Sequence, residues 1–159
     1  KFMQDSGVPL AYHHHMGTVV QSQEDTERLI DNTSDTVKLL IDTGHMMFAG
    51  GDFAKIAKDY SARLYHVHCK DIRKDVLDKA LKNDLSFIDA FFDGAFTVPG
   101  DGCIDYKHFL KTLKDLNYEG WLVVEAEQDP NKANPFEYGK IGFNHLKKIA
   151  LDCGFEITR

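Results

Sequence analysis

The chain of 159 residues is 43% hydrophobic and 28% charged, which is typical of one globular domain spanning residues 1–159. This composition excludes a disordered tail, a collagen-like fibre and a coiled coil, and no apolar run reaches the roughly 18 residues that a membrane span requires. The net charge of −6 argues against nucleic acid as a partner, because an acidic surface repels the phosphate backbone.

Short apolar runs alternate with longer amphipathic stretches along the chain. The apolar runs predict strands at residues 8–12, 37–41, 63–69 and 121–124, and the stretches after them predict helices at 22–32, 52–60, 105–116 and 135–151. Ser22 and Asp52 are typical helix N-caps. Asp25 lies three residues after Ser22, in a pattern close to a capping box.

The repeated strand–helix order is typical of an α/β fold with a parallel sheet. The strands are almost continuously apolar, as expected when both faces of a sheet are covered. Four such units are too few for a closed barrel, which needs eight. They form either a small open sheet or the second half of a barrel whose first half lies outside this chain.

The third unit contains an insertion, because about 35 residues separate Lys70 from the helix expected at 105–116. The insertion includes a short helix at residues 75–82, an apolar segment at 87–92 and a glycine-rich turn at 99–102. Insertions of this length after a strand are often lids over a functional site.

Polar side chains follow each predicted strand. They are His13, His14 and His15 after the first strand, Asp42 and His45 after the second, His66, His68, Lys70 and Asp71 at the third, and Glu125, Glu127 and Asp129 after the fourth. The carboxyl ends of parallel strands meet at one face of an α/β fold, where ligands bind. Imidazole and carboxylate groups together suit Mn, Co, Fe or Zn, so the sequence predicts a metal site at this face.

Each of these residues also has a purely structural interpretation. A lone histidine near a strand end is usually a packing or surface residue. Asp42 could form a turn with Thr43 and Gly44, and Glu125 could pair with a neighbouring lysine. The metal site is favoured because all four strand ends carry such residues at once.

The cysteines indicate the redox environment of the protein, and the first residue indicates how far the sequence extends. Cys69, Cys103 and Cys153 are odd in number and lack CxxC spacing, so we expect reduced thiols in a cytoplasmic protein. The chain begins with Lys1 rather than methionine, and we therefore expect the natural protein to extend further upstream.

Five segments carry distinctive motifs: YHHHMGT (12–18), DTGHMMFAGGD (42–52), HVHCKDIR (66–73), FTVPGDGCIDY (96–106) and GWLVVEAEQDPNKANP (120–135). Together they resemble the inosose dehydratase family, a branch of the xylose-isomerase-like barrel superfamily. The DTGH and HxHxKD patterns are shared across the superfamily, whereas YHxHxGT and VVEAEQDP are narrower. The resemblance covers nearly the whole chain and implies the C-terminal half of a (β/α)8 TIM barrel, with strands five to eight and their helices.

The resemblance also implies a set of metal ligands, with one residue at the end of each strand. Carried onto this sequence, the ligands are His13, Asp42, His68 and Glu125. Relatives usually have glutamate at the first position, so either His13 or His15 is the ligand here. The family is associated with manganese or cobalt, with iron and zinc as further candidates, and it has also been linked to glutathione.

The family reaction removes water from 2-keto-myo-inositol, a small keto-polyol of myo-inositol catabolism, and gives a trihydroxycyclohexane dione. A metal on the ketone oxygen would stabilise the enolate that forms as the α proton leaves. We expect Glu125 or Glu127 to accept this proton, and His45 or Lys70 to protonate the departing hydroxyl. The expected substrate contacts are His15, His45, Asp71 and Arg73.

Three alternative functions differ from the dehydratase in chemistry or in partner. A sugar epimerase or isomerase shares the fold and the metal, but ketose epimerases use two carboxylates, and the histidine in place of the first one favours elimination. A DNA repair enzyme resembling endonuclease IV needs a basic groove, which the net charge of −6 does not favour. A non-catalytic half-barrel would expose sheet edges and would associate into homo-oligomers.

Overall fold

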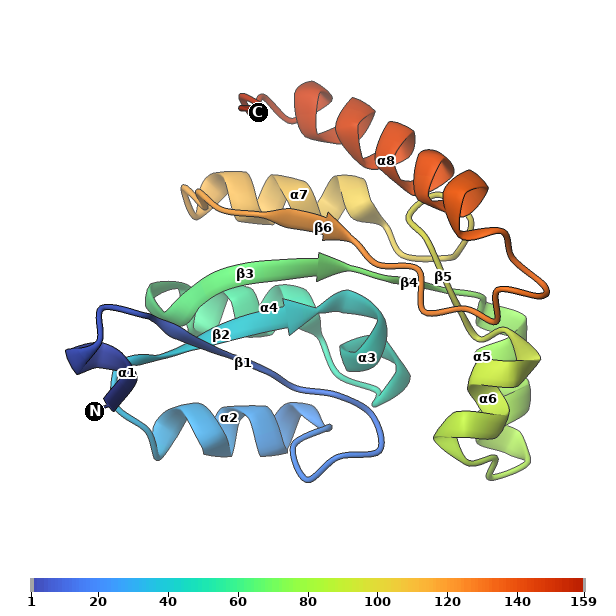
Figure 1. The fold of residues 1–159 in the computed structure, drawn as a ribbon, viewed down its shortest axis with the longest axis horizontal. Coiled ribbons are helices and arrows are strands. Elements are labelled where there is room, and N and C mark those ends of the chain that lie inside the picture. The colour runs from blue at the N-terminus through green and yellow to red at the C-terminus, as the bar shows by residue number, and fades with distance from the viewer. Residues whose placement is uncertain (1, 159) are drawn as a thin grey trace.

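A four-stranded parallel sheet organises the computed structural model, which describes residues 2–158 (Figure 1). Its strands are β1 (Leu10–His13), β2 (Val37–Asp42), β3 (Leu64–Cys69) and β6 (Leu122–Val124), in the order β1-β2-β3-β6. All three pairings are parallel. The predicted strands and their parallel arrangement are therefore confirmed, and the carboxyl ends of all four strands lie at one edge of the sheet.

Four longer helices follow the strands, as the sequence predicts. They are α2 (Gln23–Asp31), α4 (Phe53–Asp59), α7 (Tyr106–Asp115) and α8 (Pro135–Asp152). The capping box at the start of α2 is confirmed: the Asp25 N–H donates to Ser22 Oγ, and the Ser22 N–H donates to the Asp25 carboxylate, both at 3.1 Å. Asp52 caps α4 by accepting from two backbone N–H groups.

Three short helical segments were not predicted: α1 (Phe2–Asp5), α3 (Thr43–Phe48) and the single 3₁₀ turn η1 (Ser61–Arg63). Helix α3 follows β2 without an intervening loop. Asp42 makes this possible, because it is both the last residue of β2 and the N-cap of α3. Its Oδ1 accepts from the His45 N–H at 2.9 Å.

The main core lies between one face of the sheet and helices that pack behind it, of which α4 and α7 are visible in Figure 1. Side chains in this core include Leu39, Ile41, Ile56, Val67 and Phe109, each at most 1% exposed. The opposite face of the sheet is only half-buried in this chain, at Leu40, His66 and Val123. The expectation that both faces are covered is therefore wrong for the chain by itself, whose helices lie on one side.

The insertion forms a small unit beyond the carboxyl ends of the strands (Figure 1). It contains α5 (Lys74–Lys82), which confirms the expected short helix. It also contains α6 (Phe87–Asp93), where only an apolar segment was predicted, and an unpredicted antiparallel ribbon of β4 (Asp71–Ile72) and β5 (Phe96–Thr97). Buried apolar residues, among them Ile72, Leu77, Ala90 and Phe96, give this unit a core of its own. The insertion is therefore a folded element, and its apolar cluster also includes Phe48 of α3.

Two further features agree with the composition. The three cysteines are free, with Cys69 buried and Cys103 exposed. Among residues 2–158, the helices lack the combination of length and apolar character that a membrane crossing demands.

Candidate metal and catalytic site

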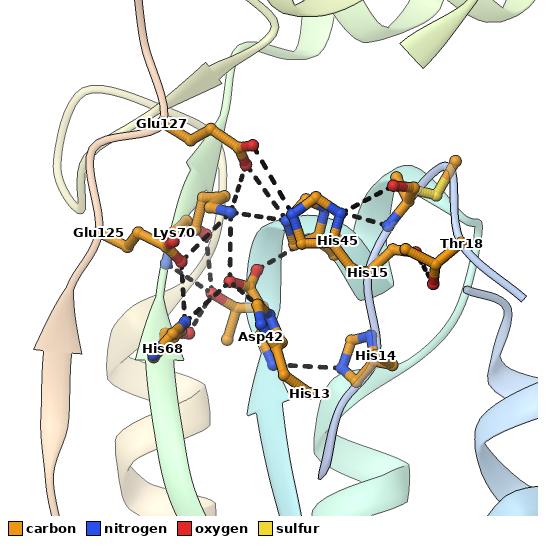
Figure 2. A network of polar contacts seen from close by, with 12 residues as sticks. His13, His14, His15, Thr18, Asp42, His45, His68, Lys70, Glu125 and Glu127 are labelled. Carbon is orange, nitrogen blue, oxygen red and sulfur yellow. Dashed lines mark hydrogen bonds and ion pairs between the residues drawn. The ribbon is translucent and has the colours of Figure 1, made fainter. Parts of the chain in front are cut away.

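Side chains from all four strand ends converge at the carboxyl edge of the sheet (Figure 2). Asp42, at the end of β2, lies at the centre and is fully buried. His13 Nε2 from β1 and His68 Nδ1 from β3 each lie 3.6 Å from Asp42 Oδ2. This convergence follows from the sheet order, because β1 and β3 are the two neighbours of β2.

Glu125 completes this group from the residue that follows β6. Its Oε2 lies 2.8 Å from His68 Nδ1. Four buried atoms of the group form charged contacts with one another or with Lys70 but no well-oriented hydrogen bond among the described residues: His13 Nε2, Asp42 Oδ2, His68 Nδ1 and Glu125 Oε2. Buried polar atoms normally have a partner. Two imidazole nitrogens and two carboxylate oxygens that face one another in this way fit a divalent cation such as Mn, Fe, Co or Zn.

A second group lies beside the first and contains His15, His45 and Glu127. Glu127 Oε2 lies 3.2 Å from His45 Nε2, and Glu127 Oε1 lies 3.7 Å from His15 Nε2. The rings of His15 and His45 are tilted against each other with centroids 3.7 Å apart. His15 Nδ1 donates to the carbonyl of Met16 at 2.7 Å, so His15 Nε2 is the nitrogen left to face the site.

The side chain of Lys70 joins the two groups and is fully buried. Its Nζ lies 2.5 Å from Glu127 Oε2, 3.2 Å from Glu125 Oε2 and 3.4 Å from Asp42 Oδ2. It also lies 2.7 Å from His45 Nε2. Three carboxylates thus surround one ammonium group. These carboxylates carry more negative charge than Lys70 balances, and a bound divalent cation would compensate the excess.

These contacts determine which groups are ionised. Burial would raise the pKa of Asp42, but His13, His68 and Lys70 together hold it well below its ordinary value. Burial would also raise the pKa of Glu127, but contacts with His45 and Lys70 outweigh it and lower this pKa to about 2. The pKa of Lys70 is raised, because the surrounding carboxylates outweigh its burial. At neutral pH these carboxylates and the ammonium group are therefore charged.

Burial lowers the pKa of His45, so this ring is neutral at neutral pH. His68 behaves in the opposite way. Burial alone would lower its pKa, but Asp42 and Glu125 raise it to about 9. Two histidines a few ångströms apart thus differ in charge, because only His68 faces two carboxylates closely.

The three consecutive histidines have different environments because successive side chains of an extended segment point to opposite sides. His13 faces Asp42 and His68, and His15 faces Glu127. His14 points the other way into the interior, where its Nε2 accepts from the Asp42 N–H at 3.2 Å. Burial lowers the pKa of His14 to about 3, so it is neutral. No role for His14 was predicted from the sequence, although alternating side chains in an extended segment indicate that one of the three histidines is buried.

Asp71 and Arg73 lie apart from both groups and bind other parts of the chain. Asp71 Oδ1 accepts from the N–H groups of Ile72 and Ile104 at 2.8 and 2.9 Å, and its Oδ2 accepts from the Gly100 N–H at 3.3 Å. Arg73 donates to the Gly94 carbonyl and to Asp101. Both side chains hold the segment 94–104 in place. Both residues therefore have a structural role, and their substrate contacts stay a prediction.

Two aromatic residues of the insertion border the site and were interpreted from sequence as core or left without a role. The centroid of Phe96 lies 5.2 Å from that of His45, and the centroid of Phe87 lies 5.6 Å from that of His15. Phe87 is only half-buried. The insertion thus supplies an apolar wall beside the polar strand ends, which agrees with its predicted place over the site.

Parallel strands that alternate with helices and all end at one polar cluster are typical of a TIM barrel, of which this chain forms about one half. Residues 1–149 match the family described as xylose isomerase-like TIM barrel, and the chain belongs to this family. The crystal structure of the IOLI protein with a bound zinc atom shares the fold. It has a TM-score of 0.63 and 21% identity, over 95% of this chain and 50% of that one.

Two curated relatives are much closer in sequence. The chain is 49% identical over 156 residues to the rhizopine catabolism protein MocC of Rhizobium meliloti, covering 98% of this chain and 48% of the relative. It is 47% identical over 149 residues to the inosose dehydratase of Clostridium beijerinckii, covering 93% and 50%. The chain thus spans about half the length of the curated relatives it matches, which agrees with the expected half-barrel.

The role of Asp71 can be tested in the full-length protein. Asp71→Ala should lower the free energy of unfolding by about 3 kcal/mol, because buried backbone N–H groups lose their acceptor. Asp71→Asn retains one oxygen and should cost less. Urea denaturation measures both, and metal content should be unchanged. An unchanged stability together with a raised KM would instead indicate a substrate contact.

Proposed function

We propose that the complete protein is a metal-dependent hydro-lyase that removes water from 2-keto-myo-inositol in inositol catabolism. The observation that carries this proposal is the set of four buried ligand atoms that face one another, without a well-oriented hydrogen bond among the described residues, beside the charged pair of Lys70 and Glu127. The identity of about one half to inosose dehydratases supports the choice of substrate.

The proposed metal ligands are His13, Asp42, His68 and Glu125. A divalent cation held there would supply Lewis-acid polarisation of the substrate ketone, which makes the neighbouring C–H more acidic. Mn and Co are the first candidates, and Fe and Zn suit the same donors. The zinc atom bound by the structurally similar IOLI protein agrees with this range.

The chain's own groups would then move two protons. Glu127 accepts the α proton, the electrons of that C–H bond form a C=C bond, and the C–O bond of the β hydroxyl breaks. Lys70 donates a proton to this oxygen, so that water leaves. Lys70 suits the role of acid better than His45, because Lys70 is protonated and His45 is neutral. A substrate lying between Lys70 and Glu127 would also weaken their ion pair and make Glu127 more basic.

The distribution of carboxylates favours elimination over epimerisation. Glu125 and Glu127 both follow β6, whereas the β1 side of the site carries the histidines His13 and His15 (Figure 2). An epimerase removes a proton from one face of its substrate and returns a proton to the other, so it needs a proton carrier on each side. An elimination needs its base on one side only.

The reaction is tested with the full-length protein loaded with Mn or Co and supplied with 2-keto-myo-inositol. We expect the dione product, and we expect Glu127→Gln to lower kcat by at least about 100-fold with metal retained, since this substitution removes the proton acceptor. Glu137→Gln, on the exposed start of α8, is the matched control and should not change kcat. Formation of an epimer without the dione, or full activity of Glu127→Gln, would contradict the proposal.

The ligand set is tested by the contrast between neighbouring histidines. His13→Ala should lose the metal, because His13 faces Asp42 and His68. His15→Ala should retain it, because His15 faces Glu127. Metal per chain is measured by elemental analysis after loading and desalting. Loss in His15→Ala with retention in His13→Ala would assign the ligand to the other histidine.

Metal affinity should depend on pH through His68. Its pKa of about 9 means that His68 holds a proton at neutral pH, which an incoming cation must displace. Affinity for Mn²⁺ should therefore rise by about tenfold for each pH unit up to about pH 9. Calorimetric titration at several pH values measures this slope. An affinity that stays constant across this range would show that His68 is not a ligand.

A further inference from the structure

We infer that Thr43 and Tyr106 are positioning residues that hold Lys70 in its place between the carboxylates of the site. This inference deepens the proposed function and rests on it for the catalytic role of Lys70. The observation behind it is a hydrogen-bond network. The Tyr106 hydroxyl bonds to the Thr43 hydroxyl, which in turn bonds to the backbone N–H and C=O of Lys70.

The hydroxyl of Thr43 makes every hydrogen bond available to it within this network. Thr43 Oγ1 lies 2.7 Å from the carbonyl of Lys70, which can only accept, so the Thr43 proton points there. The carbonyl of His68 is farther away, at 3.4 Å. The Lys70 N–H donates to the same Oγ1 at 3.2 Å. One side chain therefore fixes both the N–H and the C=O of Lys70, and Thr43 itself is completely buried.

Tyr106 supplies the remaining bond to this hydroxyl. Its OH lies 2.9 Å from Thr43 Oγ1. Because the Thr43 proton is committed to a carbonyl, the tyrosine must be the donor. Tyr106 is 1% exposed, and burial raises the pKa of its hydroxyl, which keeps the donated proton in place. Since Tyr106 begins α7, directly after the insertion, this bond ties the position of Lys70 to the packing of the following helix.

Gly44 confines the rest of the Lys70 side chain. A Cβ at Gly44 would lie 2.7 Å from Lys70 Cγ and 2.9 Å from its Cδ, so the aliphatic stem packs directly against the glycine backbone. Near its other end, Nζ lies 5.3 Å from the centroid of the Phe96 ring. The stem is held between a backbone and an aromatic ring, and a lysine with this little rotational freedom keeps its ammonium at fixed distances from the carboxylates.

The two residues between Asp42 and His45 thus have defined tasks: Thr43 anchors the backbone of Lys70, and Gly44 leaves room for its stem. Neither Thr43 nor Tyr106 is among the groups that would hold the cation or move a proton. Their removal should misplace the acid of the reaction without removing it, which lowers kcat more than it changes substrate binding.

The test compares the hydroxyls of buried Tyr106 and half-buried Tyr118 in the full-length, metal-loaded protein. Tyr106→Phe should lower kcat by about tenfold, with metal content and KM close to those of the unsubstituted protein. Tyr118→Phe is the matched control, because its hydroxyl donates at 3.0 Å to the Trp121 carbonyl and not to Thr43, and it should retain full kcat. Thr43→Ser, which keeps the hydroxyl, should retain most activity, whereas Thr43→Val should lose as much as Tyr106→Phe.

A double-mutant cycle separates positioning from general loss of structure. If Tyr106 acts through Lys70, Tyr106→Phe should cause no further loss of kcat in a Lys70→Met background. Independent, multiplicative losses would overturn the inference, and so would full activity of both Tyr106→Phe and Thr43→Val.

A spectroscopic measurement makes the inference independent of the substrate. In ¹⁵N-lysine-labelled protein, the buried Lys70 ammonium should give a signal protected from solvent exchange, identified by its absence from Lys70→Met. Tyr106→Phe should shift or broaden this signal, and Tyr118→Phe should not. A failure to dehydrate 2-keto-myo-inositol would thus disprove the proposed function and leave this result standing. An unchanged signal in Tyr106→Phe, or no protected signal at all, would overturn the inference.

Discussion

The buried carboxylate of Asp42 is the constraint on which the rest of the site depends. One oxygen caps α3 and the other faces His13, His68 and Lys70. The backbone N–H of Asp42 is held by His14 at the same time. A single residue thus ends a strand, begins a helix and places a negative charge where three basic groups meet. Any displacement of the β2 end would therefore change the secondary structure and the site together.

The second level of organisation is the balance of charge around Lys70. A buried ammonium is stable only with close counter-charges, and here the counter-charges come from β2 and from the segment after β6, far apart in the sequence. Neutral His45 lies in direct contact with ionised Glu127, at 3.2 Å from ring nitrogen to carboxylate oxygen. Acid and base character are therefore set by which side chain faces which, and the strand order of the sheet decides that arrangement.

The strands, the main helices and the polar strand ends could be predicted from the sequence, because apolar periodicity and the alternation of strands with helices can be read along the chain. The sequence could not decide between His13 and His15, since this depends on the pleat of β1. The structural role of Asp71 and Arg73 could not be predicted either, because it depends on the β4–β5 ribbon, which brings both residues to segment 94–104. Helix α3 was not predicted, nor was the hydrogen bond between Thr43 and Tyr106, because these two residues lie 63 positions apart in the sequence.

The excess of negative charge at the strand ends has a consequence for folding. In the unfolded chain these carboxylates are dispersed and solvated, whereas the fold brings them together around one lysine. A cation that binds only the folded state adds RT ln(1 + [L]/Kd) to its stability, about 2.7 kcal/mol at a free concentration of 100 Kd. With the divalent metal of the proposed function, the supply of that metal would change the folded fraction of the protein, and metal limitation would increase the turnover of unfolded chains.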